Sequence, residues 1–101
     1  MANLAREMER GGKADALLNN EMYKEAVSRV RQGIYDRWSE SPIADKDGQH
    51  ALRLMLKLLN DLEANIREVA QTGKLASLQH EEEVKQKSAF KRVINILGVR
   101  T

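Results

Sequence analysis

A repeating apolar pattern in residues 47–72 constrains the fold of this chain more than any other feature. Apolar residues recur there at alternating intervals of three and four, at Leu52, Met55, Leu59, Leu62, Ile66 and Val69. These intervals are typical of a heptad seam, along which one α-helix packs against another. Leu54, Leu56 and Leu58 lie off the seam, so the first half of this helix is apolar on nearly every side. One neighbouring helix cannot cover so wide a surface, and we expect another helix of the chain or a second subunit to cover the rest.

A second amphipathic helix is predicted upstream, beginning within residues 14–20 and ending near residue 38. Its apolar residues form one stripe, at Tyr23, Val27, Val30, Ile34 and Trp38. Asn19 or Asn20 is suited to cap its first turn. Gly33 lies in its middle, where we expect close packing against a neighbouring helix, with a hinge as the alternative.

Residues 39–48 are predicted to form the loop between these two helices. Pro42 disfavours a helical conformation at the residue before it, and Asp45 and Asp47 offer capping oxygens to the helix that follows. An antiparallel hairpin results, roughly residues 14–38 against 47–72. We expect Trp38 to pack at its loop end, near Leu52 or Met55.

Glycines are predicted to delimit the remaining segments. Gly11-Gly12 is expected to end a short N-terminal helix, and Thr72-Gly73 to end the leucine-rich helix. A polar helical segment follows, and it becomes apolar only at Phe90, Val93, Ile94 and Leu97. The predicted architecture is all-α: an N-terminal helix or arm (1–13), a helical hairpin (14–76) and a C-terminal helical arm (77–101). Because the chain has only 101 residues, covering the apolar surface calls for self-association, through Leu54, Leu56, Leu58 and the four residues of the arm.

The composition argues against several classes of function. The chain has no cysteine, which excludes disulfides, thiolate metal sites and cysteine nucleophiles. His50 and His80 have no serine or carboxylate at a spacing that fixes catalytic geometry, and the run from Glu81 to Glu83 is typical of a solvated helix face. No apolar run is long enough to span a membrane, and no signal peptide is recognisable. We therefore expect a soluble intracellular protein that is not an enzyme and has no cofactor or metal.

The end of the chain is basic. Residues 84–101 contain Lys85, Lys87, Lys91, Arg92 and Arg100 and no acidic residue, although the net charge of the whole chain is only +2. Such a patch can contact phosphates. The alternative is that these side chains keep a docking helix soluble.

Residues 20–76 resemble a group of small, mostly uncharacterised helical proteins of tailed bacteriophages and prophages, which accompany head and packaging genes. The resemblance rests on three features: a helix that ends with Tyr35 and Trp38, a Ser-x-Ser-Pro loop leading to Asp-x-Asp-Gly, and a closing Gln-Thr-Gly-Lys-Leu-Ala at residues 71–76. It implies a viral protein of the host cytoplasm or the virion, with a role in virion assembly. It transfers no catalytic residue and does not extend to the arm.

The function we expect is therefore non-enzymatic: a phage structural or assembly protein that acts through helix–helix contacts with itself and with other phage structural proteins. Two alternatives remain open. One is a DNA-packaging accessory, similar to a small terminase subunit, whose basic arm contacts DNA. The other is an anti-defence protein that sequesters a nucleotide signal or blocks a host protein.

Overall fold

The computed structural model describes residues 3–98, which form three α-helices and no strand. α1 spans Leu4–Leu18, α2 spans Glu21–Glu40 and α3 spans Lys46–Ile96. With 51 residues, α3 is about 77 Å long at the rise of an α-helix. The molecule measures 82 × 26 × 16 Å, and its radius of gyration is 23.3 Å, against about 13 Å for a compact domain of this length. The predicted all-α class is confirmed, and the molecule is elongated.

Side-chain caps set the starts of α2 and α3, as the sequence predicts. The Asn20 side chain accepts a hydrogen bond from the backbone N–H of Tyr23 (2.9 Å), and the Asp45 carboxylate accepts one from the N–H of Gly48 (3.0 Å). At the end of α2, both the hydroxyl and the N–H of Ser41 donate to the Trp38 carbonyl. These bonds satisfy backbone groups that have no partner within a helix, so they hold the loop between α2 and α3 to a few residues.

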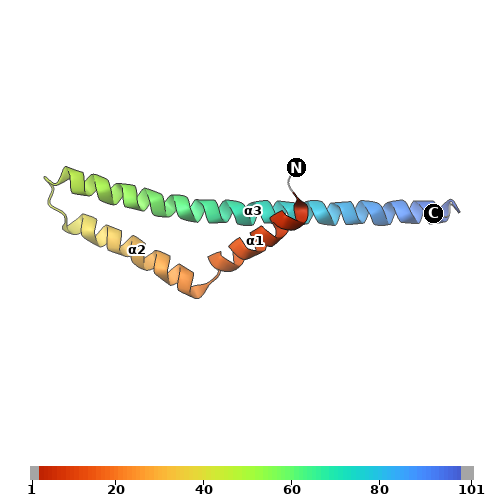
Figure 1. Cartoon of the computed structure of the whole chain (residues 1–101), viewed down its shortest axis with the longest axis horizontal. Coiled ribbons are helices and arrows are strands. Elements are labelled where there is room, and N and C mark those ends of the chain that lie inside the picture. Colours follow the sequence, from red (N-terminus) through yellow and green to blue (C-terminus); the bar gives the residue numbers. More distant parts are fainter. Residues whose placement is uncertain (1–2, 99–101) are drawn as a thin grey trace.

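The two helix ends predicted at glycines are wrong. α1 continues through Gly11 and Gly12 to Leu18, and α3 continues through Thr72 and Gly73 to Ile96. The physical reason is that α1 crosses α3 at this place (Figure 1), so Gly11 and Gly73 are both buried in the contact between the helices. Glycine here allows close approach instead of ending a helix.

The crossing of α1 over α3 is the most closely packed part of the molecule. A Cβ atom added to Gly73 would lie 2.5 Å from the Gly11 Cα and 3.0 Å from the Glu7 carbonyl oxygen. Around this point the buried side chains are small, namely Ala14 on α1 and Ala70 and Ala76 on α3. Small residues at a crossing let two helix backbones approach more closely than leucines would.

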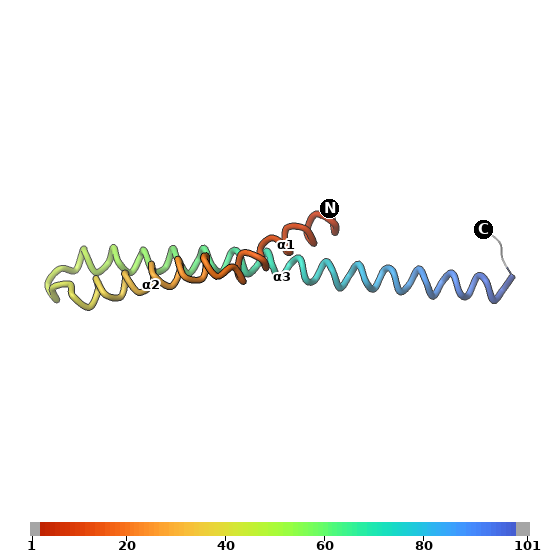
Figure 2. Tube along the Cα trace, turned by 90° about the horizontal axis from the view of Figure 1, so that it is seen from below, coloured from red at the N-terminus to blue at the C-terminus, as the bar shows by residue number. Residues whose placement is uncertain are grey.

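α2 runs back beside the first half of α3, in the opposite direction (Figures 1 and 2). Ile34 is the one residue of α2 that is buried. The close packing expected at Gly33 is wrong, since an added Cβ there would have no atom within 4 Å. A closely packed hairpin of α2 and α3 is therefore not confirmed, because the tight contact of α3 is with α1.

The seam of α3 is shifted from the predicted one. The residues of α3 that are buried or half-buried towards α1 and α2 include Leu52, Leu56, Leu59, Glu63, Ile66, Ala70 and Gly73. Four of the six predicted seam residues are half-buried, namely Leu52, Leu59, Ile66 and Val69, whereas Met55 and Leu62 are about half exposed. The shift arises because a glutamate, an alanine and a glycine occupy inward positions that an apolar pattern does not reveal.

The rest of α3 extends beyond both other helices as a straight arm (Figure 2). Within the described residues, the arm comprises residues 77–98. Every residue from 79 to 93 is exposed. The predicted C-terminal arm is therefore present as a continuation of the leucine-rich helix, without a break at residue 73.

Candidate functional site

Two apolar grooves flank the contact between α2 and α3. The first groove has a volume of about 520 Å³ and an apolar lining of Ile34, Tyr35, Trp38, Leu52 and Leu56, with Lys46, Gln49, His50 and Arg53 at its edge. The second groove has a volume of about 630 Å³ and is lined by Val30, Gly33, Ile34, Met55, Leu58, Leu59 and Leu62, with Arg29 and Arg37 beside them. Trp38 lies in the first groove with Leu52, one of its two predicted neighbours, and Met55 lies in the second. Apolar side chains around two open grooves are suited to contact another apolar surface.

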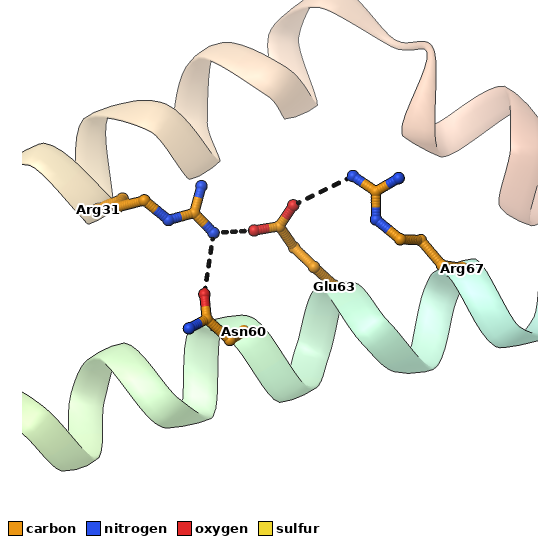
Figure 3. A network of polar contacts seen from close by, with 4 residues as sticks. All are labelled: Arg31, Asn60, Glu63 and Arg67. Carbon is orange, nitrogen blue, oxygen red and sulfur yellow. Dashed lines mark hydrogen bonds and ion pairs between the residues drawn. The ribbon is translucent and has the colours of Figure 1, made fainter.

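A polar network also joins α2 to α3, through residues that line neither groove (Figure 3). Arg31 of α2 donates a hydrogen bond to the Glu63 carboxylate of α3 and another to the Asn60 side chain (3.2 Å). Arg67 lies 3.8 Å from the other oxygen of Glu63. Glu63 is largely shielded from solvent, and a carboxylate in such a position requires a cationic partner. The network therefore fixes where α2 lies along α3 without an apolar core between them.

The structure places the sequence-predicted interface residues at two separate sites on α3. Leu58 lines the second groove, Leu56 is half-buried beside the first, and Leu54 is exposed. On the arm, Phe90, Val93 and Leu97 are exposed and Ile94 is half-buried. Leu58 and Phe90 lie about 48 Å apart along the helix, so they belong to two different contact surfaces of one molecule.

The exposed apolar residues that the predicted interface does not include are more numerous, and three of them, Leu75, Leu78 and Ile96, share one side of the C-terminal half of α3. The sequence predicts a helix end at Gly73, so it does not show that Leu75 and Leu78 lie on the same continuous helix as the arm residues. The signal that finds them is the uninterrupted helical spacing from residue 75 to residue 96.

The basic residues of the arm are exposed and lie on two sides of it. Lys87 and Lys91 are four residues apart on one side, whereas Lys85 and Arg92 are seven apart on another. Arg100 lies outside the described residues. Over residues 3–98 the structure contains the ion pairs Lys57–Asp61 and Glu63–Arg67, which join residues four apart on α3, but no pair of Glu81 with Lys85 or of Glu83 with Lys87. The arm cations are thus available to an external anionic group.

A smaller, polar pocket of about 350 Å³ lies where the three helices meet, lined by Asp15, Leu18, Asn19, Lys24, Arg67, Ala70, Gln71 and Lys74. Within residues 3–98, no three histidine, aspartate or glutamate side chains are grouped closely enough to hold a metal ion. None of the helices described is both long and apolar enough to cross a membrane. The apolar grooves and the arm are therefore the main candidate sites.

Comparison with known proteins adds no family: no family model, no curated protein and no solved structure matches the chain.

Proposed function

We propose that this protein is a non-enzymatic structural or assembly component that acts by packing its helices against further copies of itself. Its place of action, on this proposal, is the head or DNA-packaging machinery of a tailed bacteriophage. The phage setting rests on the resemblance of residues 20–76 to small helical phage proteins. Self-association has independent physical support.

The observation that carries the proposal is the exposed area. One molecule exposes 8586 Å², whereas a compact monomer of 11.5 kDa exposes about 5800 Å². The excess is about 2800 Å², and a stable interface buries about 800 Å² on each partner. Within residues 3–98 the buried apolar residues are Ala14, Ile34, Ala70 and Ala76 alone. Burying groove residues such as Leu58 against a second copy supplies the core that one molecule lacks, and it closes α2 onto α3 as an antiparallel hairpin.

Sedimentation equilibrium of the full chain tests self-association. Leu58→Asp and Phe90→Asp place a carboxylate at each apolar contact surface and should shift the oligomer towards monomer by at least tenfold in dissociation constant. Asn65→Asp and Ser88→Asp are matched controls, because each adds the same charge to an exposed polar position of α3. A wild-type chain that remains monomeric at micromolar concentration refutes the proposal.

DNA contact is a second candidate, supported by the four exposed arm cations that form no ion pair among the described residues. A protein that neutralises Z phosphates shows an affinity that falls with salt at a slope of about −0.9Z. Replacing Lys85, Lys87, Lys91 and Arg92 together with glutamine should abolish that slope. Binding to duplex DNA that is absent at low salt, or unchanged by the replacement, refutes this candidate.

A further inference from the structure

The arm carries an apolar stripe on the side opposite to α1. Gly73 and Ala76 of α3 are buried against α1. Leu75 lies two residues after Gly73, and Leu78 lies two residues after Ala76. Two residues rotate a helix by about 200°, so these leucines point away from α1. The exposed stripe continues in the same phase through Ala89 to Val93 and Ile96, with Glu82, Lys85 and Gln86 at its middle.

The spacing of this stripe is the same from either end. From Leu75 the steps are three, four and three, to Leu78, Glu82 and Lys85. From Ile96 backwards the steps are again three, four and three, to Val93, Ala89 and Gln86. The stripe is therefore symmetric about a point between residues 85 and 86, and two copies running in opposite directions bring its apolar ends together.

Charge distinguishes the antiparallel from the parallel arrangement. In a parallel pair in register, Glu82 faces Glu82 and Lys85 faces Lys85, and such like charges repel. In the antiparallel pair, Glu82 faces the partner's Ala89 and lies about 10 Å along the axis from the partner's Glu82. The two Lys85 side chains, next to Gln86 at the two-fold axis, are the only like charges of the stripe that still lie close together. Glu81 and Arg92 lie on one edge of the stripe, so each Glu81 comes within about 3 Å along the axis of the partner's Arg92.

We propose that the arms of two copies pair antiparallel along residues 75–96, about a two-fold axis between residues 85 and 86. The proposal rests on the self-association proposed above and names its partner surface and direction. Two observations support a second copy as the occupant: the excess exposed area exceeds the ~800 Å² per partner that a stable dimer needs, and Glu81 at the edge of the stripe meets the oppositely charged Arg92 of the second copy. α1 does not obstruct the pairing, because it covers the other side of α3.

Disulfide trapping tests the direction, since the chain contains no cysteine of its own. The antiparallel pair places residue 78 opposite residue 93, whereas two copies of residue 78 lie about 22 Å apart. A mixture of Leu78→Cys and Val93→Cys full-length chains should form the mixed disulfide dimer under mild oxidation, and Leu78→Cys alone should form little. Lys91→Cys replaces Val93→Cys in the control mixture, because it lies on the other side of the arm. Efficient trapping of Leu78→Cys with itself shows a parallel pair and overturns the proposal.

Charge reversal and molecular length provide independent readouts. Glu81→Arg or Arg92→Glu alone should weaken the dimer by roughly three- to tenfold, and the double variant should restore it, because the exchanged charges meet again only in an antiparallel pair. Small-angle scattering should give a longest dimension of about 125 Å, against 82 Å for a single molecule. A double variant as weak as the single ones, or a dimer no longer than the monomer, overturns the proposal.

Sedimentation separates this proposal from the proposed function. An oligomer whose Leu78→Cys and Val93→Cys chains do not cross-link refutes the arm pairing and leaves self-association standing. A monomeric wild type refutes both.

Discussion

Replacing Gly11 or Gly12 with alanine should change the stability of this protein in opposite directions. Both glycines lie inside α1, so alanine at either position gains the same helix propensity, about 1 kcal/mol. An added Cβ at Gly12 meets no atom within 4 Å, whereas at Gly11 it meets the backbone of Gly73 and the Val69 carbonyl oxygen, the latter at 3.3 Å. A backbone cannot rotate aside as a side chain can, so α1 has to move away from α3.

The difference between the two variants isolates the cost of that movement, because the propensity gain is common to both. Overpacking of a closely packed site costs about 1–3 kcal/mol. Gly12→Ala should therefore raise the free energy of unfolding by up to about 1 kcal/mol. The free energy of unfolding of Gly11→Ala should be about 2 kcal/mol lower than that of Gly12→Ala. For a chain of this size, about 2 kcal/mol corresponds to a difference of roughly 10 °C in Tm.

Thermal unfolding followed by circular dichroism at 222 nm measures this difference, at equal protein concentrations because self-association adds to apparent stability. Hydrogen exchange of the α1 amides supplies a local readout, since Gly11→Ala should lower protection there first. If Gly11→Ala stabilises the protein as much as Gly12→Ala, α1 does not cross α3 at these glycines and the reasoning is wrong.

Three further predictions concern the remaining contacts. Asn20→Ala should lower the free energy of unfolding by about 1 kcal/mol through loss of the α2 cap, whereas Asn20→Asp should retain it; chemical denaturation of the three proteins compares them. A double-mutant cycle of Arg31→Ala and Glu63→Ala should give a coupling of about 0.5–1.5 kcal/mol that decreases in high salt; a coupling of zero shows that the pair does not join α2 to α3. Ala70→Leu should destabilise by about 1–3 kcal/mol because it overfills the crossing, and thermal unfolding should show no such loss for Ala64→Leu, which places the same side chain on an exposed position.

Helix starts and the loop were predictable because their signals are local. Asn20 and Asp45 cap α2 and α3 through bonds to groups three residues away, and Pro42 lies between the two helices. Such bonds depend on the neighbouring sequence and hardly on the rest of the fold. The apolar content of α3 likewise predicted that its surface exceeds what one helix can cover.

The candidate site was only partly predictable. Leu58 and Phe90 were identified because large apolar residues in excess are visible in the sequence. Leu75 and Leu78 are not identifiable in this way, because the sequence pattern predicts a helix end at Gly73, just before them. A glycine between helical segments permits both a termination and a close crossing, and only the presence of Gly11 opposite Gly73 decides between them.

Local signals in the amino-acid sequence are enough to show that this chain is helical and that α3 has more apolar surface than one neighbouring helix can cover, because helix propensity, capping and apolar periodicity all act over a few residues. Three features follow from tertiary packing instead: Gly11 meets Gly73, Glu63 lies in the seam with Arg31 as its partner, and the leucine-rich helix continues into the arm. Each of these depends on a residue far away in the chain, and a local pattern carries no information about which distant backbone will lie against it.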